Sequence, residues 1–349
     1  MPAADAMNER IYDVLRYALK QQRPTVLRTA LSARQGKVSE GLRREMLGGD
    51  AVSADEKGVV SPLLTEQDGA LVFDEPVLPP ERMLLLGGGH VAQPVCAFAA
   101  ACGFRVTVVD DRPSFANRTR FPDAAQVVCD GFAHAITQFH PGAYDYIVIV
   151  TRGHAHDAAC LRSVLTGDFP AYVGMIGSRR RVKAQLELLA EEGFDRDKLA
   201  KVCTPIGLSI GSVTPEEIGV SILAQVISYR RLPQYAPPGR WVNGSDLEPE
   251  MIRYLAENRE PKAVVTILSA KGSTPRKAGA KMAVSPLGQV TGSIGGGCAE
   301  SEVIQRARKL IGTGGFEVFH VDMTGEVAQE EGMVCGGVMD VLIEDDIGL

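Results

Sequence analysis

Two short segments near the C-terminus place a cysteine against a run of glycines. Their residues are Gly295, Gly296, Gly297, Cys298, Cys335, Gly336 and Gly337. Glycine allows backbone N–H groups to approach an anion, and the start of a helix favours both negative charge and a thiolate. The two segments therefore predict a binding site for a small anionic ligand that seeks thiols. The alternative is that the glycines form tight turns and the cysteines are small core residues.

The centre of the chain contains the elements of an α/β domain. Short apolar runs alternate with segments of helical spacing, which predicts a parallel sheet with helices on both faces. The expected strands are 83–86, 105–111, 126–129, 146–150 and 171–176. The expected helices are 92–102, 156–165, 179–192 and 214–229. A proline-rich stretch at 233–239 predicts a stiff linker after the last helix.

The first of these strands leads into a dinucleotide-binding fingerprint. Gly87, Gly89 and Ala92 have the spacing G-x-G-x-x-A between a strand and a helix, and His90 lies within it. Such a turn predicts a nucleotide whose pyrophosphate lies against the helix N-terminus. The alternative is a Rossmann scaffold that keeps the turn and has lost the nucleotide.

Two acids end the second strand, at the place where a ribose-binding carboxylate is expected. They are Asp110 and Asp111, and the neighbouring Arg112 leaves NAD and NADP both open. The polar residues that follow later strands, at the edge where open parallel sheets bind ligands, are His154, His156, Asp157 and Arg179–Arg181. They predict an acid–base pair or metal ligands beside an anion-binding arginine run, or alternatively only the start of a helix.

The two ends of the chain resemble each other. A shift of 237 residues aligns identical residues at Arg16/Arg253, Tyr17/Tyr254, Pro24/Pro261, Thr29/Thr266 and Leu31–Ala33/Leu268–Ala270. Both segments have the pattern of a helix, a proline turn and a strand. The first segment has no counterpart of residues 275–298. We therefore expect a repeated scaffold of which only the second copy carries the glycine–cysteine loop.

The composition is that of an ordinary globular protein and argues against several classes of function. The 349 residues are 45% hydrophobic, and the net charge of −6 gives no electrostatic basis for binding nucleic acid or an anionic membrane. No apolar run approaches the roughly 20 residues of a membrane span, and the N-terminus lacks the pattern of a signal peptide. Seven cysteines without a regular framework fit reduced thiols. We expect a cytoplasmic protein.

Longer motifs give the chain a family resemblance. The segments GGGHVAQP, GHAHDAACL, YVGMIGSRRR, GSTPRKAGAKM, GQVTGSIGGGCAES and GMVCGG resemble the xanthine dehydrogenase accessory factor family (XdhC/CoxI), over about residues 81–345. Members of that family usually carry the domain with the glycine–cysteine segments before the Rossmann domain. Here the intact copy of that domain follows the Rossmann segment, and a degenerate copy precedes it. A homodimer would restore the usual pairing between two chains.

The resemblance implies a cofactor chaperone rather than an enzyme with turnover of its own. Such proteins are thought to bind the molybdenum cofactor (molybdopterin with its metal) and to protect it while a terminal sulfido ligand is installed. They then hand it to a molybdenum hydroxylase. The implied partners are a client such as xanthine dehydrogenase and a sulfur-donating enzyme.

The resemblance also assigns expected roles to residues of the C-terminal segment. The residues expected to bind the phosphate or another part of the cofactor are Arg276, Lys281, Gly295, Gly296, Gly297, Gly336 and Gly337. Cys298 and Cys335 are soft ligands that would contact molybdenum or pass sulfur. Glu300 would hold an N–H edge of the pterin. The plainer alternatives are solvated charges, a partner for the helix dipole and, with weak support, a zinc site.

The sequence thus predicts an α/β protein with a central Rossmann-like parallel sheet flanked by two related α/β segments, the N-terminal one degenerate. The expected domains are 1–80, 81–232 and 233–349. The favoured function is binding and delivery of molybdenum cofactor. The main alternative is an NAD(P)-dependent oxidoreductase, in which Gly89 and Asp110 would matter more than Cys298. A purely scaffolding role would leave both glycine–cysteine segments unexplained.

Overall fold

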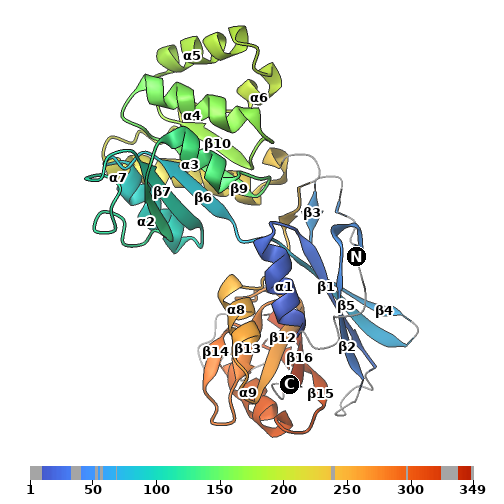
Figure 1. Ribbon diagram of the computed structural model, residues 1–349. Helices are drawn as coiled ribbons and strands as arrows, with labels where there is room; N and C mark the ends of the chain where they lie inside the picture. Colours follow the sequence, from blue (N-terminus) through green and yellow to red (C-terminus); the bar gives the residue numbers. More distant parts are fainter. Residues whose placement is uncertain are drawn as a thin grey trace. The chain divides into compact units, whose positions relative to one another are not determined.

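The chain folds into two compact units (Figure 1). The computed structural model describes residues 10–32, 41–51, 54–55, 58–67, 69–236, 240–295, 298–323 and 337–346. One unit, called the Rossmann unit below, is Pro80–Val242, and the other, called the paired unit, joins Met1–Pro79 to Asn243–Leu349. The two end segments, which the sequence suggested as separate domains, therefore lie together in one unit.

Five parallel strands form the sheet of the Rossmann unit. They are β6 (Arg82–Leu86), β7 (Arg105–Asp110), β8 (Gln126–Cys129), β9 (Asp145–Ile149) and β10 (Tyr172–Met175). Their spatial order is β10-β9-β6-β7-β8, as in a doubly wound nucleotide-binding sheet, and the winding reverses between β6 and β9. The predicted strands and the parallel sheet are confirmed.

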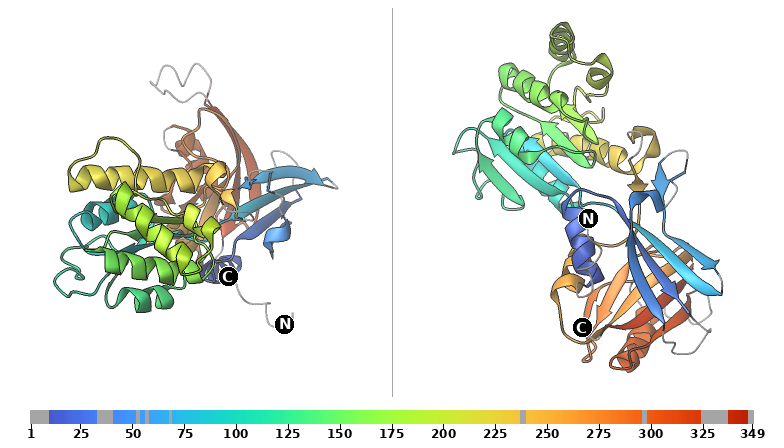
Figure 2. Two further views of the ribbon diagram at one scale, coloured as in Figure 1. Left: turned by 90° about the horizontal axis from the view of Figure 1, so that it is seen from above. Right: turned by 45° about the vertical axis from the view of Figure 1, so that its right-hand side comes forward.

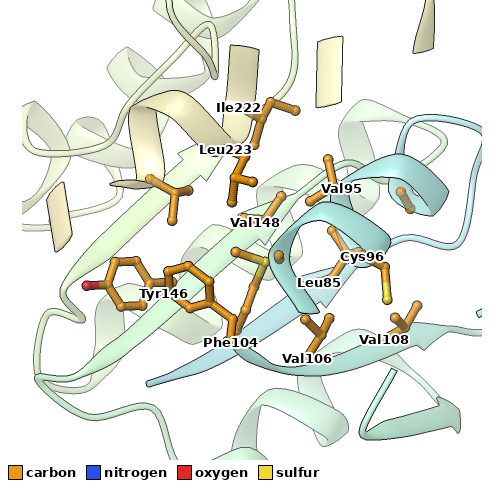
Figure 3. Packing of buried hydrophobic residues seen from close by; sticks show 14 of the residues in the cluster. Leu85, Val95, Cys96, Phe104, Val106, Val108, Tyr146, Val148, Ile222 and Leu223 are labelled. Atoms are coloured by element: carbon orange, nitrogen blue, oxygen red, sulfur yellow. The ribbon is translucent and has the colours of Figure 1, made fainter. Parts of the chain in front are cut away.

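Helices cover both faces of this sheet and enclose two apolar cores. On one face, α2 (Ala92–Ala101) and α7 (Pro215–Arg231) pack against the sheet, with Val95, Tyr146 and Ile222 among the buried side chains (Figure 3). The helices that contribute to the core of the other face are α3 (Phe132–Phe139), α4 (His154–Thr166), α5 (Arg179–Glu191) and α6 (Arg196–Ala200). Because both faces are covered, central strands such as β6 and β9 are apolar along their length.

A capping box starts α7, the last of the expected helices. Thr214 Oγ1 accepts a hydrogen bond from Glu217 N at 3.2 Å, and Glu217 Oε2 accepts one from Thr214 N at 3.0 Å. Pro215 occupies the first turn, where no N–H is needed. The short helix η2 (Pro233–Tyr235) follows at the beginning of the predicted linker.

Two antiparallel sheets form the paired unit (Figure 2). The first has the order β2-β1-β5-β4 and consists of β1 (Thr25–Leu31), β2 (Leu42–Leu47), β4 (Leu63–Gln67) and β5 (Ala70–Val77). The second has the order β14-β13-β12-β16-β15 and consists of β12 (Lys262–Gly272), β13 (Lys281–Val284), β14 (Val290–Gly292), β15 (Phe316–Asp322) and β16 (Gly337–Asp346). Leu31 and Phe73 of the first sheet share a buried cluster with Leu268 and Leu342 of the second, so the sheets face each other.

The remaining elements are short strands and helices around these sheets. They are α1 (Ile11–Lys20), η1 (Gly49–Ala51), β3 (Val59–Val60), β11 (Val242–Asn243), α8 (Pro249–Glu257) and α9 (Cys298–Leu310). Helices α1 and α8 share one apolar cluster, in which Leu15 and Leu255 are fully buried. Helix α9 covers the outer face of the second sheet through Val303 and Ala307.

The two halves of the paired unit correspond strand by strand. The shift of 237 residues carries α1 onto α8 and β1 onto β12. Thr29 of β1 lies opposite Arg44 of β2, as Thr266 of β12 lies opposite Lys281 of β13. On their other edges β1 and β12 pair with β5 and β16 in matching register. This correspondence supports the proposal that residues 1–80 are a degenerate copy of the C-terminal domain. The expectation that the first copy has no counterpart of residues 275–298 is wrong for β13, because β2 is its counterpart.

Two buried ion pairs join the halves reciprocally. Lys281 Nζ lies 2.8 Å from Glu75 Oε2, and Arg44 Nη2 lies 2.5 Å from Glu344 Oε1. Glu75 and Glu344 occupy equivalent positions of β5 and β16. Each cation also donates a hydrogen bond to the threonine opposite it in its own half. Each half therefore supplies the cation of one pair and the carboxylate of the other.

The outer faces of the two sheets differ because only one of them carries α9. The residues buried beneath α9 include Val265, Met282 and Ile343. Their register equivalents in the first sheet are Arg28, Glu45 and Asp74. Arg28 forms a two-pronged ion pair with Asp74 at 2.7 and 2.9 Å. Among the described residues no helix covers this face of the first half, so it bears charges where the second half has a helix-covered core.

Candidate functional site

The first glycine–cysteine segment leads directly into α9. Gly295 has a φ of +133°, and a Cβ atom there would lie 3.2 Å from Pro275 Cγ, so both the backbone conformation and the close approach require glycine. Gly296 and Gly297 lie outside the described residues. Cys298 is the first residue of α9. The backbone therefore places the predicted cysteine at a helix N-terminus, where a thiolate is favoured.

Glu300, in the first turn of α9, ties this segment to the helix. Its Oε1 accepts hydrogen bonds from Ser293 Oγ at 2.8 Å, Ile294 N at 3.0 Å and Gly295 N at 3.2 Å. A carboxylate that reaches back to amides ahead of its own helix fixes the path by which the chain enters that helix. The structure gives Glu300 this positioning role, and its contact with a pterin stays a prediction.

The second segment enters the sheet beside the first. Gly337 begins β16, and a Cβ atom at this position would lie 2.6 Å from Thr274 Cγ2. Because the adjacent Pro275 touches Gly295, the turn of Thr274 and Pro275 lies between the two segments. The Thr274 hydroxyl is buried and has no hydrogen-bond partner within the described ranges. The predicted residues of this segment that lie outside the described residues are Cys335 and Gly336.

The two cations expected at this site have acidic partners elsewhere. Arg276 Nε lies 2.8 Å from Asp246 Oδ2, and its Nη1 lies 2.8 Å from Glu248 Oε1. Lys281 lies between the two sheets, where both oxygens of Glu75 accept from its ammonium and burial lowers its pKa. A phosphate contact by either side chain stays a prediction, and it would require these ion pairs to open.

The glycine turn of the Rossmann unit follows β6 as predicted, but its three glycines differ in their surroundings. Gly87 has a φ of +111°, and a Cβ atom there would lie 2.4 Å from Val150 O at the end of β9. At Gly88 a Cβ atom would lie 2.5 Å from Phe115 O. Gly89 has no atom within 4 Å of its Cβ position among the described residues. The chain's own packing explains the first two glycines, and Gly89 is the one that leaves room for a ligand.

Asp110, the expected ribose contact, is buried and bonded within the protein. Its Oδ2 accepts from Gly88 N at 2.8 Å, and its Oδ1 accepts from Arg112 N at 3.0 Å and Arg112 Nε at 2.9 Å. Burial alone would raise the pKa of Asp110, but the hydrogen bonds from Arg112 and Gly88 hold it below its ordinary value. Asp110 thus fixes the glycine turn to β7, and its contact with a ribose stays a prediction.

Asp111, the other acid, points to a different partner. It forms a two-pronged ion pair with Arg152, which follows β9. The hydrogen bonds from Arg152 lower the pKa of Asp111 to about 2. The pair links the ends of β7 and β9 across β6, at the edge of the sheet where doubly wound folds bind ligands.

The predicted histidine and aspartate at the start of α4 bond to separate partners. Arg181 Nη1 lies 3.2 Å from His154 Nε2, and because a guanidinium only donates, this nitrogen of His154 accepts. Asp157 accepts a hydrogen bond from Thr151 Oγ1 at 2.6 Å, and burial raises its pKa. Asp157 therefore anchors the turn between β9 and α4, while His154 and Arg181 lie together on the surface.

His90 lines a cavity of about 430 Å³ beside the first turn of α2. The polar and charged residues of its wall are His90, Gln93, Arg120, Asp123 and Glu216. Arg120 Nη2 donates to Gly88 O at 3.2 Å and to Gln93 Oε1 at 3.1 Å, whereas its Nε is buried without a partner in the described part of the chain. The wall combines both signs of charge, so it fits a polar group better than a simple anion.

Sequence reasoning missed a polar row on the second sheet. Ser269 Oγ donates to Asp340 Oδ2 at 2.7 Å, and His320 Nδ1 lies 2.7 Å from Asp340 Oδ1. The three residues lie side by side on β12, β16 and β15. Their positions in the sequence contain no spacing signal, because only the pairing of the three strands brings them together.

A metal centre built from the protein alone is not found among the residues that the structure describes. They contain no group of three or more His, Cys, Asp or Glu side chains arranged to hold a metal ion. The metal contacts expected of Cys298 and Cys335 stay predictions. Of the helices within the described ranges, none is both long and apolar enough to span a membrane.

Two family models match the chain. The XdhC Rossmann domain matches residues 83–226, and the XdhC and CoxI family matches residues 255–322. The first match covers the Rossmann unit from β6 into α7. The second covers α8 in part, all of β12 to β14, and α9 and β15. Both candidate sites, the glycine turn and the first glycine–cysteine segment, thus lie within matched regions.

Individual relatives match over parts of their length. An uncharacterized protein YqeB of Escherichia coli (strain K12) is 28% identical over 202 residues, which are 58% of this chain and 35% of that protein. A protein of Bacillus subtilis (strain 168) described as a probable xanthine dehydrogenase subunit is 29% identical over 160 residues, 46% of each protein. The chain therefore spans less than half of the length of either relative.

One solved structure gives a further comparison. A crystal structure of a xanthine dehydrogenase from Bacillus halodurans shares 24% sequence identity, covers 61% of each chain and has a TM-score of 0.47. The family matches, which together cover more than half of the chain and most of the Rossmann unit, carry the assignment. This chain belongs to the XdhC/CoxI family of xanthine dehydrogenase accessory protein homologues.

Proposed function

We propose that this chain binds the molybdenum cofactor at its glycine–cysteine segments and delivers it to a xanthine dehydrogenase-type molybdenum hydroxylase. The observation that carries the proposal is the meeting of Gly295 and Gly337 at the turn of Thr274 and Pro275. The buried hydroxyl of Thr274 has no partner within the described residues. A buried polar group without a partner is unfavourable, and a polar ligand at this turn would satisfy it.

The chain's own residues would bind and orient the cofactor, which supplies a metal–sulfur centre, a pterin and a phosphate. The start of α9 provides positive potential and a cysteine, and both suit an anionic ligand that seeks thiols. Glu300 holds Ile294 and Gly295 in place before the ligand arrives, which reduces the ordering that binding must bring about. In this proposal the chain is a chaperone of the cofactor and has no turnover of its own.

The test is the cofactor content of the protein purified from a host that makes molybdenum cofactor. Pterin fluorescence and molybdenum are measured for the wild type, for Cys298→Ala and for Cys102→Ala. Cys102 is an exposed free cysteine of the Rossmann unit and serves as the matched control. We expect pterin in the wild type and in Cys102→Ala and its loss in Cys298→Ala. Equal pterin in all three proteins would remove the thiol from the proposal, and no pterin in any would refute cofactor binding.

The proposal includes partners that can be tested separately. The client is a molybdenum hydroxylase, a sulfur-donating enzyme would act on the bound cofactor, and the chain would work as a homodimer in the cytoplasm. Mixing the loaded protein with cofactor-free hydroxylase should restore hydroxylase activity in proportion to the pterin that is transferred. Light scattering of the purified protein should give twice the mass of one chain.

A second candidate function is an NAD(P)-dependent oxidoreductase. It is favoured by the strand order of the Rossmann unit and by the open position of Gly89. It is weakened because Asp110 is bonded to Gly88 and Arg112. Calorimetric titration with NADH and NADPH distinguishes the two functions: tight binding by a protein free of pterin would favour the oxidoreductase.

A further inference from the structure

The polar row of Ser269, Asp340 and His320 has a fixed geometry. The carboxylate of Asp340 uses one oxygen for each neighbour, with both contacts at 2.7 Å. Burial alone would raise the pKa of Asp340, but hydrogen bonds from Ser269 and His320, with the charge of Lys271 nearby, hold it below its ordinary value. The carboxylate is therefore ionised at neutral pH and held from both sides.

This arrangement sets the tautomer of His320. An ionised carboxylate only accepts hydrogen bonds, so Nδ1 of His320 carries the hydrogen that points at Asp340. In the neutral imidazole, Nε2 then has a free lone pair. The side chain of His320 is 61% exposed, so a ligand can reach this nitrogen. A carboxylate that orients a histidine in this way is the usual arrangement for a proton acceptor.

The row lies toward the end of the sheet where the glycine–cysteine segments meet. Asp340 is the fourth residue of β16, which begins at Gly337 beside Thr274. The next pairs along the sheet toward that end include Lys271 with Val338, followed by Gly272 with Gly337. At about 3.3 Å per residue, three residues along β16 correspond to about 10 Å, which is the scale of a pterin-sized ligand.

The first half of the paired unit provides an internal comparison. In matching register, Leu71 takes the place of Asp340 and Glu66 takes the place of His320. The half whose described residues include no counterpart of α9 thus lacks both members of the pair. The strands differ as well: β12 has an irregularity in its pairing with β16 between Ile267 and Ser269, whereas β1 pairs with β5 in continuous register.

Irregularities of this kind re-aim side chains and are frequent beside active sites. Here the shift brings Ser269 opposite Asp340. Three features, namely the shifted register, the aspartate and the histidine, therefore occur in the half that carries the glycine–cysteine segments and are absent from equivalent described positions in the other. In the first half, Leu71 packs against the apolar cluster between the two sheets at the position that corresponds to Asp340. A leucine is therefore sufficient for packing there, and the polar pair is not required for it.

We propose that His320, positioned by Asp340 and Ser269, is the proton acceptor of the C-terminal site and acts on a ligand that carries a sulfhydryl. The choice of a sulfur ligand rests on the proposed function. In the step, the S–H bond of the ligand breaks, its electron pair stays on sulfur, and the proton forms a bond with Nε2 of His320. The products are a thiolate and an imidazolium whose Nδ1–H remains bonded to Asp340. No electron transfer and no further reactant are needed.

The charges around His320 favour this step. Asp340 on β16 faces it directly, Lys271 lies on β12, and Asp322 lies two residues further along β15 on the same face. The adjacent carboxylate stabilises the imidazolium that forms. In model compounds the imidazolium and the sulfhydryl have pKa values of about 6.5 and 8.5, close enough for proton transfer near neutral pH.

The first experiment measures the titration of His320 in the intact protein. The Cε1–H signals of the histidines are followed by NMR between pH 5 and 9, and His320→Gln assigns the signal. Asp340→Asn should move the titration midpoint of the His320 signal to lower pH, because the facing carboxylate is lost. Glu66→Gln, at the equivalent place in the other half, should leave it unchanged. The same titration with 2-mercaptoethanol should raise the apparent pKa of His320, whereas ethylene glycol, its oxygen analogue, should not.

The second experiment measures pterin retention as a function of pH. Retention by the wild type should rise with pH, with its midpoint at the pKa of His320, because only the neutral imidazole accepts the proton. In Asp340→Asn the midpoint should move to lower pH by the shift seen in NMR. In His320→Gln the pH dependence should disappear, and Glu66→Gln should behave as the wild type. A purely structural role would change the amount retained without moving the pH profile.

The outcomes separate this inference from the proposed function. Pterin retained with the same pH profile in the wild type and His320→Gln would overturn the role of His320 and leave cofactor binding intact. A response of the His320 pKa to 2-mercaptoethanol, in a protein that never contains pterin, would support the proton acceptor and refute the cofactor. A His320 pKa that responds neither to Asp340→Asn nor to the thiol would overturn the inference by itself.

Discussion

Lys281 and Glu75 form an ion pair between the two halves of the paired unit, although 206 residues separate them in the chain. The ammonium lies 2.8 Å and 3.1 Å from the two carboxylate oxygens, and both side chains are 1% exposed. Desolvation of two charges is unfavourable, and their mutual attraction offsets it only while both partners are present. The pair therefore specifies how the halves meet more than it adds to stability.

Removal of Lys281 should destabilise the paired unit strongly. Lys281→Met leaves Glu75 buried without a counter-charge, and we expect a loss of about 3–5 kcal/mol in the free energy of unfolding. The double variant Lys281→Met with Glu75→Leu should recover most of that loss, because no buried charge remains. Arg16→Ala, which removes an exposed pair with Glu257, should change stability by less than about 1 kcal/mol. Urea unfolding followed by circular dichroism measures all three.

Replacement of Glu300 should loosen the glycine–cysteine segment. Glu300→Ala removes the acceptor of three hydrogen bonds from the segment ahead of α9. We expect a loss of about 1–2 kcal/mol in stability, as for other helix caps, with faster amide exchange at Ile294 and Gly295. Glu302→Ala, on the same helix, removes only an exposed pair with Arg306 and is the control. Equal exchange in the two variants would contradict the positioning role of Glu300.

Replacement of Asp110 should affect the fold of the Rossmann unit even without a nucleotide. Asp110→Asn removes the charge that accepts from Gly88 and Arg112, and we expect a loss of about 1.5–3 kcal/mol. Thermal unfolding in the absence of ligand measures this loss, and titration with NADH measures any effect on binding. Unchanged stability with weaker NADH binding would contradict the structural role of Asp110 and support its contact with a ribose.

The pair of Asp111 and Arg152 should contribute to the acid stability of the Rossmann unit. The pKa of Asp111 is lowered to about 2 by Arg152, below the value of about 3.9 in an unfolded chain. Its contribution is therefore fully present above about pH 4 and is lost as the pH falls from there toward about 2. The stabilities of the wild type and Asp111→Asn should converge near pH 2 and differ by a constant amount above about pH 5. A constant difference across the whole range would assign the effect to packing.

The parallel sheet of the Rossmann unit could be predicted from the sequence because its signals are local. Central strands such as β9 are apolar runs buried on both faces, and the residues that cap α7 are adjacent in the sequence at Thr214, Pro215 and Glu217. The glycine turn after β6 was placed correctly for the same reason. The spacing of residues could not show that Phe115 packs against Gly88 or that Arg112 donates hydrogen bonds to Asp110, because loop contacts depend on tertiary packing.

The contacts of the candidate site depended on register, which the sequence does not display. Arg276 and Lys281 look like free cations in a glycine-rich segment, yet Asp246 and Glu75 are bonded to them. The pairing of His320 with Asp340 needs the alignment of β15 on β16. The resemblance between the ends of the chain did indicate a repeat. It could not indicate that each copy would supply the cation of one ion pair and the carboxylate of the other.

The charged outer face of the first sheet makes the divergence of the two halves difficult to reverse. Insertion of a loop and helix like those of the second half would cover Arg28, Glu45 and Asp74, which stand where Val265, Met282 and Ile343 lie beneath α9. Three strands would have to exchange charged for apolar residues at once, and each partial step would bury an unpaired charge. The divergence therefore acts as an evolutionary ratchet: a lineage that has acquired these charges cannot regain a helix-covered face on the first half by single substitutions.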